Sequence, residues 1–129
     1  MKWSEQAERL RRKAAGDEAA MTALLGVSSV PDEVIGFHAQ QAVEKLLKAL
    51  LSHRRVAFRR THDLTELLDL LAASGVTIPP HIAEVRRLGP YAAEFRYEDI
   101  PDDTDEPFDR RWTAECVERT RRWVESLLS

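Results

Sequence analysis

The stretch FHAQQAVEKLLKAL, residues 37–50, decides the fold of this chain. Its apolar residues recur with the 3.6-residue period of an α-helix, and with their neighbours they fill an arc of roughly 160°. A surface helix needs a narrower arc, so this helix must contact at least two others. We therefore expect it to be the central helix of a bundle, extending over about residues 32–54. Its expected inner positions are Ile35, Ala39, Ala42, Val43, Leu46, Leu47, Ala49 and Leu50.

The same helix carries a compact polar face. His38, Gln41, Lys45 and Lys48 follow one another at intervals of three or four residues, which places them near one line along the helix. Glu44 belongs to the same arc, which is roughly 120° wide. Such a coherent polar face indicates either a binding surface or a polar network that sets the register of the helices.

Helical periodicity dominates the rest of the chain, and no strand alternation or internal repeat interrupts it. Four further helices are expected, over residues 3–25, from residue 63 to just before Gly75, and over 80–97 and 108–128. Five helices joined by mostly short connections predict an all-α, up-and-down four- or five-helix bundle in a single domain of residues 1–129.

Local signals mark the ends of these helices. The D-x-x-E spacing of Asp63 and Glu66 predicts a capping box at the start of the third helix. The fourth helix should break at Gly89-Pro90, because proline cannot donate the helical hydrogen bond.

The composition is that of a globular protein, with 43% hydrophobic and 32% charged residues. A net charge of -3 argues against a nucleic-acid binder that works through a bulk positive field. Paired arginines leave local basic patches open, although solvated helix faces produce the same pairs. The single cysteine, Cys116, is expected in the core and suits a reducing compartment. No window approaches the roughly 18 apolar residues of a membrane span, so we expect a cytoplasmic protein.

The sequence holds no convincing metal or cofactor motif. Seven carboxylates lie between Glu98 and Asp109, but the EF-hand spacing is absent and this loop contains no histidine or cysteine. The four histidines lie on different expected elements, and the five glycines form no phosphate-binding loop. We therefore predict no metal and no cofactor.

Three motifs in order resemble the HEPN family, the higher eukaryotes and prokaryotes nucleotide-binding domains. Family members show an FHAQQAxEKxLKAxL second helix, a tHdL start to the third helix and a YxxxRYPD segment near the end of the fourth. The resemblance extends over roughly residues 30–128, with Glu98 standing where the family often has proline. The matching residues are Phe37, His38, Gln40, Gln41, Ala42, Glu44, Lys45, Leu47, Lys48 and Ala49, then Thr61, His62, Asp63 and Leu64, then Tyr91, Arg96, Tyr97 and Asp99.

This resemblance implies a bundle like the C-terminal domain of kanamycin nucleotidyltransferase. It also implies a homodimer that works with a small nucleotidyltransferase, as a toxin-antitoxin-like pair or a two-subunit transferase, in which the HEPN chain binds nucleotide or substrate without catalysis. Lys45, Lys48 and Arg96 would then meet phosphate oxygens, while His38, Gln41 and Tyr97 would hydrogen-bond or stack on a base.

A structural alternative stays open for the same residues. Glu44 precedes Lys48 by one helical turn, and Glu44 or Asp99 could pair with Arg96 or Lys45. The result would be a buried network that only sets helix register.

A second function remains open, because many HEPN proteins are metal-independent ribonucleases with an Arg-x(4 to 6)-His motif. The pair Arg55 and His62 fits that spacing. It lies before the third helix, whereas the catalytic motif of the family usually lies later in the chain, so we expect His62 to serve the start of that helix instead. A nucleotide or RNA remains a possible ligand in either case.

Overall fold

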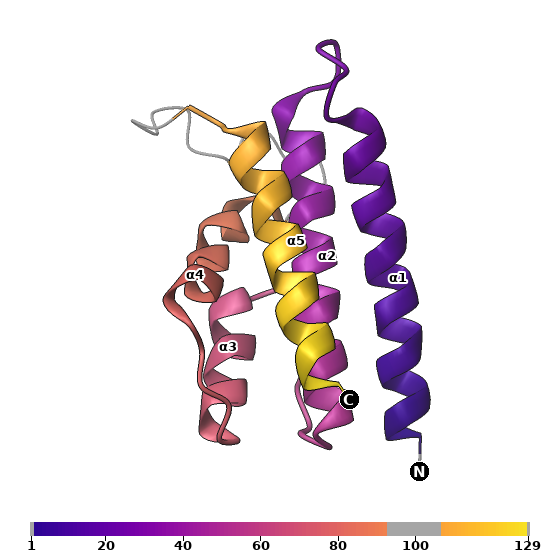
Figure 1. The fold of residues 1–129 in the computed structure, drawn as a ribbon, viewed down its shortest axis with the longest axis vertical. Coiled ribbons are helices and arrows are strands. Elements are labelled where there is room, and N and C mark those ends of the chain that lie inside the picture. Colours follow the sequence, from indigo (N-terminus) through magenta and orange to yellow (C-terminus); the bar gives the residue numbers. More distant parts are fainter. Residues whose placement is uncertain (1, 93–106, 129) are drawn as a thin grey trace.

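The computed structural model describes residues 2–92 and 107–128, and within them the fold is all-helical (Figure 1). The long helices α1, α2 and α5 run side by side, and the shorter α3 and α4 flank them on one side. None of the helices in these two ranges is long and apolar enough to cross a bilayer. The elements are α1 (Trp3–Leu24), α2 (Asp32–His53), α3 (Leu64–Ala73), α4 (Pro80–Ala83), the 3-10 helix η1 (Glu84–Ala92) and α5 (Arg110–Leu127).

Helix α2 is the central helix, as the sequence predicts. It contacts α1, α3, η1 and α5. Thirteen of its 22 residues are buried, and they include all eight predicted inner positions. Each fully buried leucine contributes about 2 kcal/mol of hydrophobic stabilisation, so this helix carries much of the core. The predicted helical bundle is confirmed.

The start of α3 confirms half of the predicted capping box. The Asp63 carboxylate accepts hydrogen bonds from the backbone N–H groups of Thr65 and Glu66, at 3.0 and 3.3 Å. The Asp63 N–H donates to Thr61 Oγ1 instead, and the Glu66 carboxylate binds the Arg59 guanidinium. The cap is therefore completed by the segment that precedes α3.

The fourth predicted helix is wrong in its geometry. Only Pro80–Ala83 is α-helical, and η1 continues as a 3-10 helix through Gly89 and Pro90 without a break at that pair. A 3-10 helix has three residues per turn, so residues three apart lie on one line. Val85 and Leu88, the buried residues of η1, have that spacing, and Ile82 of α4 precedes Val85 by three residues, so the three are buried together. Residues 93–97 of the predicted helix lie outside the described residues.

Arg110 joins the start of α5 to the turn between α1 and α2. Its Nη1 donates to backbone carbonyls near the end of α1, and its Nε donates to the Asp32 carboxylate at 2.8 Å. One guanidinium thus binds several carbonyls of the turn that follows α1, and it fixes how α1 is connected to α2. The carbonyl acceptors are those of Leu24, Leu25, Val27 and Val30.

Candidate functional site

The polar face of α2 borders α1, where Asp17 ties two of its members together. The Asp17 carboxylate accepts a hydrogen bond from His38 Nδ1 at 3.1 Å and forms an ion pair with the ammonium of Lys45. The Asp17 side chain is only 13% exposed, whereas His38 and Lys45 keep about a quarter of their side-chain surface in solvent. Asp17 therefore holds two partly exposed groups, two helical turns apart on α2, in fixed positions.

A second network lies further along α2, around the buried carboxylate of Glu44. This residue is 3% exposed, and its oxygens contact Lys48 Nζ at 2.9 Å, His62 Nδ1 at 2.9 Å and Gln40 Nε2 at 3.1 Å. Gln40 Nε2 also donates to the backbone carbonyl of His62 at 3.1 Å. A buried carboxylate is tolerated when such partners replace its hydration, so this network joins α2 to the start of α3.

Gln41 lies between the two networks. Its Nε2 donates to Gln40 Oε1 at 2.8 Å, and the side chain is partly buried. The Gln40 amide cannot be reversed without loss, because its nitrogen faces two acceptors. The orientation of the fully buried Gln40 therefore sets that of Gln41.

The charges of this face balance. Lys45 is paired with Asp17, and Lys48 with Glu44. The two ammonium groups and the two carboxylates sum to zero. A phosphate placed about 4 Å from either carboxylate would be repelled by about 1 kcal/mol in water and about 4 kcal/mol at an effective dielectric constant of 20. Over the residues that the structure describes, the face is thus polar and pre-organised but not cationic.

The structure places four of the six predicted ligand-binding residues together on one side of α2: His38, Gln41, Lys45 and Lys48. The Glu44–Lys48 ion pair of the structural alternative is present at 2.9 Å. The other two predicted residues, Arg96 and Tyr97, lie outside the described residues.

Two participants were missed from the sequence. Asp17 supplies the partner of Lys45, and it follows the inner position Ala14 by three residues, a spacing that could have placed it near α2. Gln40 is fully buried and was noted only as a motif match. Asp17 and Gln40 have one sequence feature in common: each is a polar residue that lies close in the sequence to buried apolar positions.

The alternative pair, Arg55 and His62, is held by separate contacts. Arg55 lies in the turn after α2 with a φ of 60°, and its N–H donates to the Ser52 carbonyl at 3.0 Å. His62 is 64% exposed and contacts Glu44 through Nδ1. It lines a surface hollow of about 340 Å³ together with Arg86, and not with Arg55.

Neither a metal site nor an activated thiol is assembled in the described ranges. Over residues 2–92 and 107–128, no group of three or more His, Cys, Asp or Glu side chains comes close enough to hold a metal ion. Cys116 is 1% exposed, as expected of a core residue, and burial raises the pKa of its thiol to about 11. That thiol stays protonated at neutral pH and is a poor nucleophile.

Comparisons with known proteins agree with this architecture. A family model for the HEPN domain matches residues 3–128. The crystal structure of an archaeal HEPN homologue is similar over 98% of this chain and 95% of that chain, with a TM-score of 0.54 and 24% sequence identity, which shows a shared fold. A comparison with curated proteins found no match. Because the family model spans nearly the whole chain, this protein belongs to the HEPN domain family.

Proposed function

We propose that this HEPN protein is a non-catalytic subunit that binds a nucleotide or substrate through the polar face of α2. The observation that carries the proposal is the pre-organisation of His38 and Gln41. Both side chains reach solvent in part, yet each is oriented by a more deeply buried partner, Asp17 or Gln40. A side chain that is already ordered loses less conformational entropy when a ligand binds.

A network that served helix register alone would not need exposed members. Glu44 and Gln40 are buried and suit such a role, but His38, Gln41 and Lys45 all keep solvent contact. The buried half of the face therefore supports the fold, and the exposed half is free to meet a ligand or partner.

We also propose the setting that the family implies, namely a homodimer that works with a small nucleotidyltransferase as a toxin-antitoxin-like pair. A polar face on the central helix suits an interface between symmetric copies, because the same side chains then meet from both sides. Light scattering of the purified chain should give the mass of a dimer. A monomer at tens of micromolar would contradict this part of the proposal.

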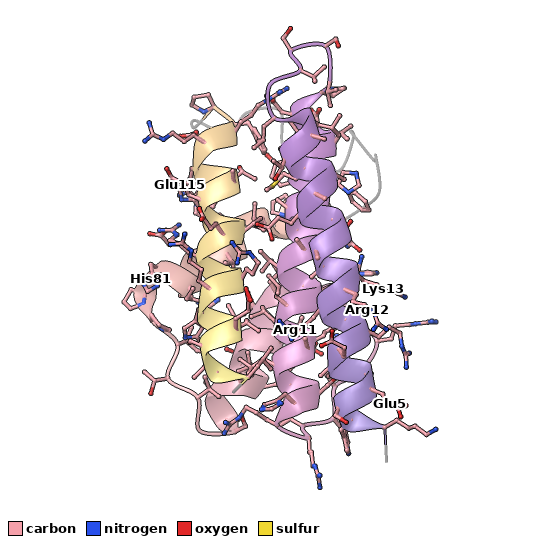
Figure 2. All side chains as sticks on the ribbon, turned by 45° about the vertical axis from the view of Figure 1, so that its right-hand side comes forward. Glu5, Arg11, Arg12, Lys13, His81 and Glu115 are labelled. Carbon is pink, nitrogen blue, oxygen red and sulfur yellow. The ribbon has the colours of Figure 1, made fainter. Side chains whose placement is uncertain are left out.

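The binding proposal is tested by thermal denaturation with and without AMP. A ligand that binds only the folded protein raises the midpoint by mass action. AMP at about 100 times its dissociation constant should stabilise the protein by about 2.7 kcal/mol, and the increase should be lost in His38→Ala and Gln41→Ala. The control is His81→Ala, an exposed histidine on α4 that points away from α1 and α2 (Figure 2). If AMP has no effect, or the effect survives both α2 substitutions, this face does not bind a nucleotide.

A ribonuclease remains the second candidate, because the Glu44–His62 contact orients an exposed imidazole. A carboxylate that accepts from Nδ1 fixes the orientation of the ring and leaves Nε2 exposed, as in other proton-transfer pairs. Arg86 shares the hollow beside His62 and would supply positive charge for a phosphoryl group. RNA cleavage in EDTA that is lost in His62→Ala but kept in His53→Ala would favour this enzyme. Intact RNA in all three samples would exclude it.

A further inference from the structure

The cations of the α2 face are already neutralised by the protein. Asp17 and Glu44 lie at the ammonium groups of Lys45 and Lys48, and both carboxylates are largely buried. An anion that approached either lysine would meet the carboxylate that holds it. A phosphate group therefore gains little at this face, although the sequence alone suggested lysine–phosphate contacts.

Among the described residues of this face, His38 and Gln41 keep hydrogen-bonding groups without a described partner. His38 Nδ1 faces the Asp17 carboxylate and donates to it, so the ring nitrogen that can accept from a ligand is Nε2. Gln41 uses one N–H for Gln40, which leaves Oε1 as an acceptor and a second N–H as a donor. The two residues are three positions apart on α2, so their side chains are neighbours. Together they offer two acceptors and one donor from neighbouring positions on α2.

We infer that this face recognises the base of a nucleotide, through an uncharged edge that carries an exocyclic amino group, and leaves the phosphates in solvent. The inference rests on the proposed nucleotide binding and deepens it. An amino group donates to the two acceptors, while an adjacent ring nitrogen accepts from the Gln41 N–H. A carboxamide makes the same paired contact with the amino edge of adenine in nucleic-acid complexes. A base with a 6-oxo group places its carbonyl oxygen, an acceptor, against the His38 and Gln41 acceptors, so no hydrogen bond forms there.

Titration calorimetry with adenosine, inosine, AMP and pyrophosphate tests this inference. Adenosine and AMP should bind with dissociation constants within about threefold of each other, and inosine should bind at least about fivefold more weakly, because a mismatched polar group costs about 1–3 kcal/mol. Pyrophosphate should not bind. Tenfold tighter binding of AMP than adenosine, or measurable pyrophosphate binding, would overturn the inference and leave nucleotide binding intact. If no ligand binds, the proposed function fails as well.

Substitution of the partners separates base recognition from phosphate attraction. Gln41→Met should remove the preference for adenosine over inosine, and the variant should fold, because Gln41 is only partly buried. Asp17→Asn keeps the shape of the side chain but removes the negative charge that pairs with Lys45. Lys45 can then bind the phosphate of AMP, so the affinity for AMP relative to adenosine should rise about tenfold, the gain of one charged contact. Glu5→Gln is the matched control, since it removes one carboxylate from α1 roughly 18 Å along the helix. An unchanged base preference in Gln41→Met, or an unchanged ratio in folded Asp17→Asn, would contradict the inference.

Discussion

The ring of Tyr91 lies directly against the backbone of Gly36. A Cβ added at Gly36 would be only 2.6 Å from Cγ and Cδ1 of that ring. Tyr91 also meets Phe108 edge-on, with ring centroids 5.3 Å apart and planes at 78°. Glycine thus lets η1 approach α2 closely, and one aromatic ring joins α2, η1 and the segment that leads into α5.

Gly36→Ala should lower the free energy of unfolding by about 1–3 kcal/mol, the usual cost of overpacking. Alanine favours a helix over glycine by about 1 kcal/mol, so the clash must exceed that gain. Urea denaturation measures the difference. In a Tyr91→Ala background the same substitution should become neutral or stabilising.

Gly16 provides the control for this prediction. It lies in α1, and apart from the local backbone of that helix no described atom lies within 4 Å of an added Cβ. Gly16→Ala should therefore stabilise the protein by up to about 1 kcal/mol. If Gly36→Ala stabilises to the same extent, the close contact with Tyr91 does not exist in solution.

Arg110→Lys should destabilise the protein by about 2–3 kcal/mol. The lysine ammonium keeps the charge but cannot reproduce the planar fork that reaches Asp32 and four backbone carbonyls at once. Arg111→Lys is the control, because that side chain is 90% exposed and should change stability by less than about 0.5 kcal/mol. Equal effects of the two substitutions would show that the Arg110 contacts contribute nothing.

Glu44→Gln should cost about 2 kcal/mol or more, since it leaves the largely buried ammonium of Lys48 without its counter-charge. The double variant Glu44→Met/Lys48→Met should recover the part of this loss that comes from the unpaired ammonium, because two apolar side chains need no partner and Gln40 Nε2 keeps its hydrogen bond to the His62 carbonyl. Glu115→Gln on the exposed side of α5 is the matched control. A double variant less stable than Glu44→Gln would argue against this assignment.

Alkaline pH should destabilise the protein through Cys116. Burial raises the thiol pKa from its ordinary value of 9.0 to about 11, so the unfolded chain ionises first. The associated stability is complete below pH 9 and is lost as the pH rises to 11, and it amounts to about 2–3 kcal/mol. Cys116→Ala should show a correspondingly smaller fall in unfolding free energy between pH 8 and pH 11. Parallel pH profiles for the two proteins would contradict this.

The helices were predictable where local and tertiary signals agree. The ends of α2 and its inner positions follow from periodicity, because burial on several sides demands a wide apolar arc. The course of η1 was not predictable by the same reasoning. The spacing of Ile82, Val85 and Leu88 fits a period of three, but Gly89-Pro90 predicts a break in the helix, which the structure does not have. Gly-Pro disfavours a helix locally, but tertiary packing decides whether the helix ends there, and the sequence pattern does not show that packing.

The candidate site was predictable only for contacts within the single helix α2. The alignment of His38, Gln41, Lys45 and Lys48 follows from helix geometry, and so does the contact of Lys48 with Glu44. The role of Asp17 depends on how α1 packs against α2, which periodicity does not specify. That contact decides the charge of the face, and hence the kind of ligand that suits it.

The central claim is that a nucleotide binds the exposed half of the α2 polar face. The most direct measurement is a two-dimensional ¹H–¹⁵N NMR titration with AMP that follows the side-chain amide of Gln41 and the ring nitrogens of His38. We expect the largest shifts at these two side chains and small shifts at His53 and His81. Shifts confined to other parts of the surface, or none at saturating AMP, would contradict the account.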